Sequence, residues 1–569
     1  MHKRLEPIII SPQTTVRDTM NVIENGVRND PPAPWGIALV MENNQLVGIV
    51  TDGDIRRAIL RGVSLENPIG TIMTRDPLTV RHSEDPAEIL AEFHRIIRER
   101  NMPESRFHHI ITLDDAGRLA DVITPFELWR RSEVKIKTVA VIGLGYVGLT
   151  LALTLCEFGI RVIGVDLNAE VIEKLKRGEP HFFEKGLTTL LKKHVNKNLL
   201  LSTKLNEHAS DIFIVCVGTP VNDRGRSDKS YLISAITEVG KIMKPHDLVI
   251  LRSTVPIGTC RNLVVPILER ESGLSHETEF MLSFAPERTI EGKALEELKT
   301  LPQIIGGINK QSLDNTSKLF QVFAHTIVSV DSLEEAEAVK LLNNTFRDVS
   351  FSFANEVSQA LDGFGISGSS VIRAANKGYT RNPIPLPSPG VGGACLVKDP
   401  HLFVESARST GYNLQLPLLS RNINESMIDF VVEKIDKFVS EHCIDPGRAK
   451  IFLAGMAFKG NPETSDLRHS TSVDILNILR SSYPNIEVFD HVASRNDLMA
   501  LGANVAESPE QGFRGASCVL ILNNHLEYPE WDIFELASTM QNPGMIFDPW
   551  GHYGKEQFHG LPQIQYTGL

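Results

Sequence analysis

The stretch KTVAVIGLGYVGLTLALTLCEFGIRVIGVD, residues 137–166, decides the fold of most of this chain. It starts with a short apolar run, turns through Gly143, Gly145 and Gly148, continues through an uncharged run typical of a buried helix, and ends in a second apolar run closed by Asp166. An acid 18 residues beyond the last glycine completes the pattern of strand, glycine turn, helix and strand. This pattern predicts a β-α-β unit that binds a dinucleotide.

Each part of this pattern has a physical reason. The glycines allow a tight turn and a close approach of the backbone to a pyrophosphate, which the helix N-terminus would face. Tyr146 and Val147 complete the turn, and the carboxylate of Asp166 is expected to hold ribose hydroxyls. That carboxylate favours NAD over NADP, because a 2′-phosphate would meet a like charge. The alternatives are a glycine-rich turn without a ligand and a membrane span over Thr138–Cys156, which the three glycines disfavour.

Composition limits the classes of protein that the chain can represent. A length of 569 residues, with 42% apolar and 22% charged side chains, is typical of about three to four globular domains. The net charge of −12 argues against a nucleic-acid partner, which needs a basic face. The six cysteines form no zinc-like spacing, so we expect no metal site and reduced thiols in the cytoplasm. The N-terminal residues lack the apolar core of a signal peptide, and we expect no membrane partner.

Apolar runs alternate with helical stretches over 137–325, which predicts a mostly parallel sheet in an NAD-binding Rossmann domain. Residues 333–363 contain no proline and no internal glycine, so we expect one long helix there. This helix and the Pro/Gly-rich loop at 379–393 belong to a central helical domain over 326–440. A second α/β domain is expected over 447–569.

The first 131 residues contain an internal repeat. GIALVMENNQLVGIVTDGDI (36–55) aligns with HHIITLDDAGRLADVITPFEL (108–128) at an offset of 73 residues. Each copy predicts a strand, a turn, a second strand and a short helix. Two copies that each expose an apolar sheet face would pack against one another.

The ends of the two copies, GIVTDGD and DVITPFE, resemble the signature of tandem CBS domains, the cystathionine-β-synthase type. In that family the threonine hydroxyl and the acidic group bind the ribose of an adenine nucleotide, which implies Thr51 and Asp54 here. The second copy departs from the signature, with Asp121 in place of glycine and Glu127 in place of aspartate. The pair is therefore either an adenine-nucleotide sensor or a purely structural or oligomerising module.

Cys395 is the candidate nucleophile. It lies in GGACLVKD (392–399), after the proline-rich loop, where functional residues often occur. The preceding Gly392 and Gly393 would permit close approach of a substrate, and Lys398 would favour the reactive thiolate. A nicotinamide site with a nucleophilic thiol suggests oxidation beyond an aldehyde, through a thiohemiacetal and a thioester that water hydrolyses. A single cysteine is more often a small core residue, and we interpret the other five in that way.

From residue 137 onward, about three quarters of the chain resembles the UDP-glucose/GDP-mannose dehydrogenase family of nucleotide-sugar 6-dehydrogenases. Seven motifs occur in the order that this family has. They are GLGYVG (143–148), VCVGTP (215–220), RSTVPIGT (252–259), APERTIEG (285–292), VKLLNN (339–344), SPGVGGACLVKDP (388–400) and GMAFKGNPETSDLRHS (455–470).

The resemblance implies an α/β protein with two Rossmann-like domains joined by a long central helix, behind an N-terminal α+β tandem CBS module. The C-terminal domain would bind the nucleotide sugar. The resemblance also implies that the enzyme oxidises the C6 alcohol of a nucleotide sugar to a uronate with two NAD⁺. Members of this family commonly form dimers through the long helix, so a homo-oligomer, a dimer or higher, is expected.

Roles for single residues follow from the same resemblance. Cys395 would be the nucleophile, Glu287 a general base or water activator, and Lys340 the oxyanion stabiliser. Asn344, one helical turn beyond Lys340, would face the C6 oxygen. The remaining implied roles are water positioning by Asp399 and Thr219, cofactor contacts by Thr219, Thr254 and Lys398, and substrate contacts by Glu287, Arg288, Lys340, Asn344, Arg381, Gly392 and Lys459, with Arg381 crossing a dimer interface.

Pro-Glu-Arg at 286–288 resembles the branch of the family that acts on UDP-N-acetylhexosamines, which we favour over UDP-glucose and GDP-mannose. Two departures from the family pattern stand out. Trp550 replaces the arginine of a frequent Asp-x-Arg motif that contacts nucleotide phosphates, and Ala394 precedes the nucleophile where relatives often carry serine or histidine. The missing arginine and the appended CBS pair motivate an alternative from another class, a nucleotide-binding regulator that kept this fold and lost the chemistry.

Overall fold

A computed structural model describes residues 3–26, 33–83, 85–99, 109–123, 138–205, 210–222, 225–324 and 326–569. The chain divides into two compact units, Met1–Ile136 and Lys137–Leu569. The interpreted linker at 130–137 and the second CBS signature residues Thr124 and Glu127 lie outside the described residues.

The first unit contains the predicted repeat, which is confirmed. Two three-stranded sheets share one pattern, in which a parallel pair precedes an antiparallel hairpin. One cluster of buried side chains includes Ile37 and Leu39 from the first sheet and Ile111 and Val122 from the second, so the copies share a core. The elements are η1 (Lys3–Ile8), β1 (Ile9–Ile10), α1 (Val16–Gly26), β2 (Ile37–Glu42), β3 (Gln45–Thr51), α2 (Asp52–Leu60), η2 (Ile69–Thr71), β4 (Thr79–Arg81), α3 (Pro86–Glu99), β5 (Ile110–Leu113) and β6 (Leu119–Ile123).

The second unit opens with an eight-stranded sheet of order β14-β13-β12-β11-β10-β7-β8-β9, parallel except between β12 and β13. Its central strands are buried along their whole length, as expected for strands covered by helices on both faces. The strands are β7 (Val139–Ile142), β8 (Val162–Val165), β9 (Leu199–Ser202), β10 (Ile212–Val215), β11 (Leu248–Leu251), β12 (Met281–Phe284), β13 (Gln303–Gly307) and β14 (Ile327–Val330).

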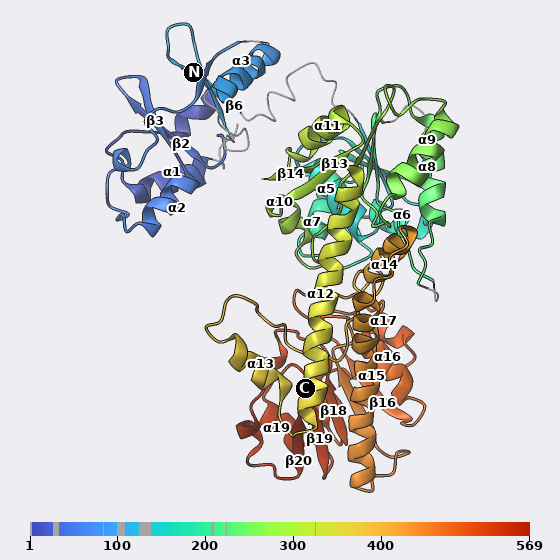
Figure 1. Cartoon of the computed structure of the whole chain (residues 1–569). Coiled ribbons are helices and arrows are strands. Elements are labelled where there is room, and N and C mark those ends of the chain that lie inside the picture. The colour runs from blue at the N-terminus through green and yellow to red at the C-terminus, as the bar shows by residue number, and fades with distance from the viewer. Residues whose placement is uncertain are drawn as a thin grey trace. The chain divides into compact units, whose positions relative to one another are not determined.

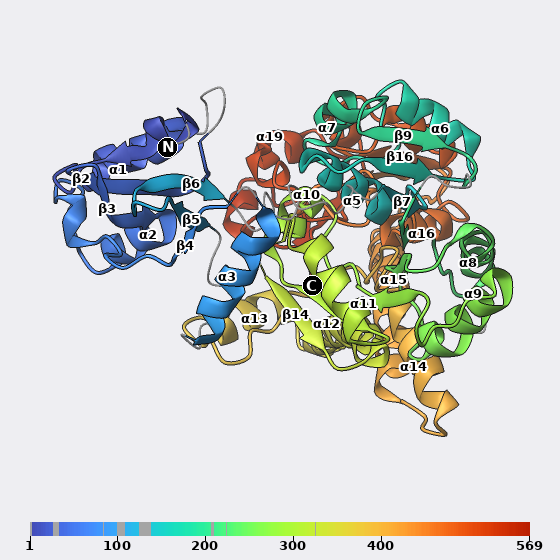
Figure 2. The same cartoon turned by 90° about the horizontal axis from the view of Figure 1, so that it is seen from above.

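Helices connect these strands, and α8 and α9 lie side by side next to the sheet (Figure 1, Figure 2). The predicted strand and helix at the start of this domain are confirmed as β7 and α5. In the described part of the chain, no helix is long and apolar enough to cross a membrane. The helices are α5 (Tyr146–Glu157), α6 (Ala169–Lys176), α7 (Leu187–His194), α8 (Ser230–Ile242), α9 (Val265–Ser272), α10 (Ala294–Thr300) and α11 (Lys310–Phe320).

The predicted long helix is confirmed as α12 (Leu333–Asp362). It runs from the eight-stranded sheet toward the six-stranded sheet of the last domain (Figure 1). Its N-cap Ser332 accepts a hydrogen bond from the backbone N–H of Glu335, which starts the helix. The helix packs along α15, so the two form the middle of this unit. The other central helices are α13 (Gly368–Asn376), α14 (Asp399–Ser409) and α15 (Leu416–Glu441).

The last domain holds a six-stranded parallel sheet of order β17-β16-β15-β18-β19-β20. The strand order reverses between β15 and β18, and such a point is where ligands bind in open α/β sheets. The elements are β15 (Lys450–Ala454), α16 (Thr471–Leu479), β16 (Asn485–Phe489), α17 (Arg495–Ala500), β17 (Asn504–Val505), α18 (Pro509–Phe513), β18 (Cys518–Ile521), α19 (Ile533–Ser538), β19 (Gly544–Phe547) and β20 (Ile564–Thr567). The predicted fold of two Rossmann-like domains, a long central helix and a CBS module is thus confirmed.

Candidate active site

The glycine turn after β7 leaves the N-terminus of α5 open. Gly143 has a φ of +89°, and a Cβ on Gly148 would lie 1.8 Å from the carbonyl oxygen of Gly143, so neither position accepts a side chain. A Cβ built on Gly145, the N-cap of α5, would meet open space among the described residues, since nothing beyond its own chain neighbours lies within 4 Å. Asp166 Oδ2 accepts a hydrogen bond of 2.9 Å from the backbone N–H of Leu144. An open helix N-terminus beside this carboxylate fits the pyrophosphate and ribose of NAD.

Tyr146 and Val147 occupy the first turn of α5. The Tyr146 hydroxyl donates to the carboxylate of Glu184 and accepts a hydrogen bond of 3.0 Å from the backbone N–H of Gly292. Burial, followed by the hydrogen bond to Glu184, raises the pKa of Tyr146. The hydroxyl therefore ties the glycine turn to the 285–292 loop, a structural task in addition to the predicted cofactor contact.

Thr219 and Thr254 follow two adjacent strands, β10 and β11, and so lie at the edge of the sheet where the glycine turn lies. The hydroxyl of Thr219, which is buried, donates to the backbone carbonyl of Thr254. A Cβ on Gly143 would lie 3.0 Å from the carbonyl oxygen of Cys216, three residues before Thr219. The backbone that leads to Thr219 thus packs against the glycine turn, and cofactor contacts by the two threonines stay a prediction.

The glycines before Cys395 have a different reason from the one the sequence suggested. A Cβ on Gly392 would lie 2.3 Å from the carbonyl oxygen of His469, and a Cβ on Gly393 would lie 2.7 Å from the ring of Phe458. Gly393 also donates its backbone N–H to the His469 carbonyl at 3.0 Å. Protein atoms of the C-terminal domain, rather than substrate, fill the space that these two glycines provide.

Cys395 lies exposed just before α14, and its carbonyl oxygen accepts a hydrogen bond of 2.9 Å from the backbone N–H of Asp399. Desolvation by the surrounding protein raises the pKa of the thiol, and Lys340 and Lys398 oppose this shift. The net direction is upward, contrary to the expectation from Lys398 alone. The resting thiol is therefore protonated near neutral pH, and its reaction needs a proton acceptor.

Asp399 is fully buried and is held on both oxygens. Asn344 Nδ2 donates to Asp399 Oδ2 at 2.6 Å, and Lys398 Nζ lies 2.6 Å from Asp399 Oδ1. Lys340, one turn before Asn344 on α12, is only 7% exposed, which excludes the ordinary role of a solvated helix charge. The charges of Lys340, Lys398 and Asp399 thus act on the Cys395 thiol, and Asn344 holds Asp399.

Glu287 is buried and accepts three hydrogen bonds. Its Oε2 accepts from Arg252 Nη2 at 2.5 Å, and its Oε1 accepts from the backbone N–H groups of Arg288 and Thr289 at 2.7 and 2.8 Å. Burial raises the pKa of Glu287, but the charge of Arg252, the N–H of Thr289 and the charge of Lys340 outweigh it, so the net direction is downward. This favours a fixed negative charge near Lys340 over the general base that the resemblance implied.

The two Rossmann domains touch where Lys459 meets the 285–292 loop. Lys459 Nζ donates to the backbone carbonyl of Glu291 at 2.7 Å, and Thr464 Oγ1 donates to Glu291 Oε2 at 3.3 Å. Burial lowers the pKa of Lys459 to about 8. Burial, and then the charge of Asp466, raises the pKa of Glu291.

Sequence reasoning assigned no role to Arg252, Glu184 or Glu291. Arg252 and Glu291 lie inside the quoted motifs RSTVPIGT and APERTIEG, so the motifs themselves contained the signal. Glu184 lies outside every quoted motif, and only its contacts with Tyr146 and Gly292 identify it.

Three further predicted positions lie elsewhere. The guanidinium of Arg288 donates to the carbonyl of Pro302 at 2.7 Å, and Arg381 is exposed on the 379–393 loop. At Trp550, where the family arginine is missing, the backbone carbonyl accepts a hydrogen bond of 2.8 Å from Arg373 Nη2 of α13. A guanidinium from another helix therefore stands beside this loop.

In the first unit, Thr51 and Asp54 form a capping box at the start of α2, with the Thr51 hydroxyl donating to Asp54 Oδ2 at 2.7 Å. Asp121, the departure in the second copy, is buried and lies 3.2 Å from Arg4 Nη2. Asp121 therefore has a structural partner of its own.

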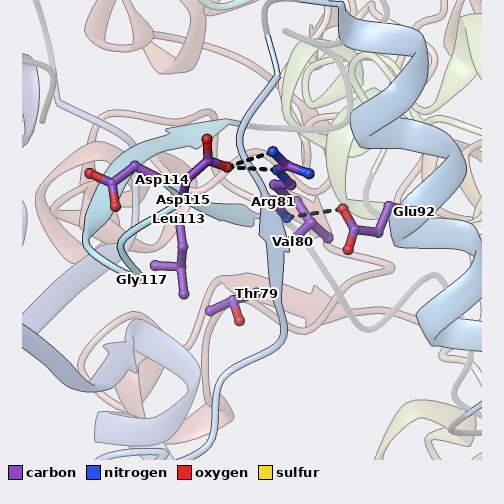
Figure 3. Close-up of a pocket in the computed structure, with 8 residues that line it drawn as sticks. All are labelled: Thr79, Val80, Arg81, Glu92, Leu113, Asp114, Asp115 and Gly117. Atoms are coloured by element: carbon purple, nitrogen blue, oxygen red, sulfur yellow. Dashed lines mark hydrogen bonds and ion pairs between the residues drawn. The ribbon is translucent and has the colours of Figure 1, made fainter.

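Figure 3 shows a pocket at the β5–β6 turn of the second copy, where Arg81 pairs with Asp115 at 2.7 Å. Glu92 accepts from the Arg81 backbone at the same place. This pocket does not include Thr51 or Asp54. Among the described residues, no group of three or more His, Cys, Asp and Glu side chains is arranged to hold a metal ion.

Comparison with known proteins adds family matches in the same order. The NAD binding domain of the UDP-glucose/GDP-mannose dehydrogenase family matches residues 137–324, its central domain 334–426 and its UDP binding domain 452–555. CBS domains match residues 1–61 and 69–128.

Individual relatives agree with these matches. UDP-N-acetyl-D-mannosamine dehydrogenase of Pyrococcus horikoshii is 32% identical over 411 residues, which cover 72% of this chain and 94% of that relative. The solved structure of the Pyrococcus horikoshii UDP-D-ManNAc dehydrogenase superposes with a TM-score of 0.68 at 30% identity, over 75% of this chain and 98% of that one. A UDP-glucose dehydrogenase from Pyrobaculum islandicum superposes with a TM-score of 0.66 at 26% identity, over 76% and 97% of the two chains.

The glycine turn with its acid, the thiol loop beside α12 and three consecutive domain matches all point to the same protein family. Its members are NAD-dependent nucleotide-sugar dehydrogenases. The chain belongs to the UDP-glucose/GDP-mannose dehydrogenase family and carries CBS domains ahead of its first Rossmann domain.

Proposed function

We propose that the protein oxidises the C6 alcohol of a UDP-N-acetylhexosamine to the carboxylate, with Cys395 as the nucleophile. The observation that carries this proposal is the grouping of one exposed thiol with Lys340, Lys398 and Asp399, which come from α12 and from the start of α14. When bound at the glycine turn beside Asp166, NAD⁺ would supply the hydride acceptor for each of the two oxidations, one molecule for each, and the alcohol proton would leave to solvent. The residues of the chain bind and orient the substrate and stabilise charge.

Lys340 is placed to stabilise negative charge on the C6 oxygen, because it lies near Cys395 and is almost completely buried. The sulfur of Cys395 adds to the aldehyde carbon, the C=O π bond opens, and the thiol proton passes to that oxygen, which becomes the hydroxyl of a thiohemiacetal. Loss of a hydride from the carbon and of the hydroxyl proton then gives a thioester. Water adds to this carbonyl, the C–S bond breaks, and the thiol is regenerated with the carboxylate product.

Asp399 and Asn344 are positioned for the hydrolytic step. The carboxylate of Asp399, oriented by Asn344 and Lys398, lies near the sulfur and can accept a proton from the attacking water. Glu287 keeps a negative charge near Lys340. These roles are the ones predicted for the site, except for Glu287. We assign it a fixed negative charge in the site rather than the role of a general base.

The choice of sugar rests on two supports. Relatives at about a third identity are named UDP-N-acetyl-D-mannosamine dehydrogenases, and the chain carries Pro-Glu-Arg at 286–288. UDP-glucose is the second candidate, because the Pyrobaculum islandicum UDP-glucose dehydrogenase has nearly the same TM-score as the UDP-D-ManNAc enzyme.

The test is NADH formation with UDP-N-acetylmannosamine, UDP-N-acetylglucosamine, UDP-glucose and GDP-mannose under the same conditions. We expect the highest kcat/KM with a UDP-N-acetylhexosamine and two NADH for each sugar consumed. One NADH per sugar would contradict the thioester route, and a preference for UDP-glucose would overturn the choice of sugar. No NADH with any of the four would favour the inactive regulator.

We also propose a homodimer across α12. Leu342, Phe346 and Phe353 of this helix are 55%, 71% and 54% exposed, at spacings of four and seven residues that place them on one face. An exposed apolar stripe on a central helix is typical of an interface between copies.

Sedimentation should give a dimer for the parent protein and a monomer for the Phe346→Glu variant. Leu526→Glu, which changes an exposed residue of the C-terminal domain, is the control and should remain a dimer. A dimeric Phe346→Glu variant would place the interface elsewhere.

A further inference from the structure

A buried polar cluster lies between α12 and α15. Its members are Asp348 and Asn355 of α12 and Arg421 and Asn424 of α15, and each is at most 2% exposed. Arg421 Nη1 donates to Asp348 Oδ1 at 2.8 Å, and Asn424 Nδ2 donates to the same oxygen at 2.9 Å. Asn355 Nδ2 donates to Asn424 Oδ1 at 2.9 Å, so the four side chains form one connected group.

This cluster reaches the backbone of the loop that carries Cys395. Arg421 Nη1 also donates to the carbonyl oxygen of Val391 at 3.3 Å, four residues before the thiol. Asn355 Oδ1 accepts a hydrogen bond of 2.8 Å from the backbone N–H of Ser388. The cluster therefore holds the part of the loop that precedes Cys395 at two backbone positions, Ser388 and Val391.

The loop also packs against the C-terminal domain. A Cβ on Gly390 would lie 2.8 Å from Thr471 Cγ2, and Cβ atoms on Gly392 and Gly393 would lie 2.3 Å from the His469 carbonyl oxygen and 2.7 Å from the Phe458 ring. The loop thus contacts both the α12–α15 pair and the 455–471 segment. The hydrogen bonds from the cluster are therefore one of two sets of contacts that hold the loop backbone.

The face of α12 that carries Asp348 also carries two residues of the candidate site, Lys340 and Asn344. Lys340, Asn344 and Asp348 follow at intervals of four residues, so they lie along one side of the helix. One rigid helix therefore sets the place of the lysine and the amide directly, and sets the place of Cys395 through Asp348 and Arg421. A buried ion pair contributes little to stability compared with apolar residues of the same volume, so stability alone does not account for it.

We propose that Arg421, with Asp348, is a positioning residue that sets the distance of the Cys395 sulfur from Lys340. This inference rests on the proposed role of Cys395. Loss of the guanidinium removes the donor to the Val391 carbonyl, and the loop then moves relative to α12. A displacement of about 1 Å in a reacting group costs about 100-fold in rate.

The test compares three variants in a Cys443→Ser background, because Cys395 and Cys443 are the exposed cysteines of the chain. Asp348→Leu/Arg421→Met removes both charges together and so avoids an unpaired buried charge. Arg421→Lys keeps a charge opposite Asp348 but cannot reach several acceptors at once. Lys434→Met is the matched control, because it breaks another ion pair between α15 and α12, that of Lys434 with Asp362. Lys434 lies 13 residues beyond Arg421 on α15, a distance of about 20 Å along the helix.

Three quantities are measured on each full chain: the melting temperature, kcat and KM for the nucleotide sugar and NAD, and the pH midpoint for alkylation of Cys395 by iodoacetamide. We expect the double variant to melt near the parent temperature, to lose about 100-fold in kcat with KM for NAD unchanged, and to show a shifted alkylation midpoint. Arg421→Lys should lose about tenfold in kcat, and Lys434→Met should match the parent in kcat and midpoint.

A double variant with parent kcat and parent midpoint would overturn the proposal and leave the cluster a purely structural role. If the double variant does not fold, Arg421→Lys decides alone, because parent values of kcat and midpoint in that variant would have the same meaning. Failure of the proposed function is distinguishable, because Cys395→Ser would then keep its activity in the parent background.

Discussion

Cys395 is an exposed thiol whose pKa lies above its ordinary value, and its reactivity depends on its neighbours rather than on a preformed thiolate. Cys395→Ser should lower kcat for two-NADH turnover by about 1,000-fold or more, because serine forms an ester that the site hydrolyses poorly. Cys443→Ser is the matched control, as an exposed cysteine in a turn beyond α15. The measurement is NADH formation with mass spectrometry of the protein for a trapped adduct. Equal NADH formation by parent and Cys395→Ser would exclude the thiol as nucleophile.

Lys459 is the residue from which we expect a pH-dependent substrate step. Burial lowers its pKa to about 8, so the ammonium is charged below that pH and loses its charge above it. If Lys459 contacts the nucleotide sugar, KM should rise by about tenfold or more as pH increases through 8, as a charged hydrogen bond is lost. Lys459→Arg keeps its charge at all these values and should give a flat KM up to pH 9. The same KM–pH curve for both proteins would argue against the contact.

At the scale of elements, the N-terminal part of α12 holds the segment that follows β11. Glu337, in the second turn of α12, is buried, its Oε1 accepts the backbone N–H of Cys260 at 2.8 Å, and its Oε2 accepts that of Gly258. Burial raises the pKa of Glu337 from an ordinary 4.5 to about 7. Folding therefore favours the protonated carboxyl of Glu337. Its contribution to the free energy of unfolding is complete below pH 4.5 and is lost as pH rises through 7.

The free energy of unfolding should consequently fall by about 3 kcal/mol between pH 4.5 and pH 8 through this one group. Glu337→Gln, which does not titrate, should lack this part of the decrease when denaturant unfolding is followed across that range. Glu334→Gln, in the first turn of the same helix, is the control, because the hydrogen bond from Arg261 lowers the pKa of Glu334 and gives the opposite sign. Parallel pH profiles for the parent and Glu337→Gln would show that Glu337 does not carry the effect.

At the scale of the whole molecule, the CBS unit is expected to sense an adenine nucleotide through Thr51 and Asp54. Calorimetry of the full chain with ATP, ADP and AMP should detect binding of at least one of them, and the bound nucleotide should change the rate of NADH formation. Thr51→Val should weaken binding about tenfold or more, through the loss of a ribose hydrogen bond. No heat with any of the three nucleotides would favour a structural module.

The capping role of Thr51 requires a control in the same unit. Thr15 and Asp18 form a similar pair at the start of α1, where the Thr15 hydroxyl donates to Asp18 Oδ2 at 2.8 Å. Thr15→Val removes a helix cap of the same kind, at a cost of about 1 kcal/mol, without touching the predicted ribose contact. Equal losses of nucleotide binding in both variants would trace the effect to the helix cap.

The sequence by itself determined the features that depend on local spacing. The glycine turn with Asp166, the long helix α12 and the repeat in the first unit follow from the periodicity of apolar residues and from the conformations that only glycine adopts. The motif order also placed Cys395, Lys340, Asn344 and Asp399 in one candidate site.

Only the tertiary structure decided how those residues are used. Glu287 is paired with Arg252, 35 residues away, which favours a fixed negative charge at this position. Gly392 and Gly393 allow close contact with His469 and Phe458. The physical reason is that hydrogen bonding, burial and the resulting pKa of each group depend on neighbours from distant segments, and these neighbours become adjacent only when the sheets and α12 pack together.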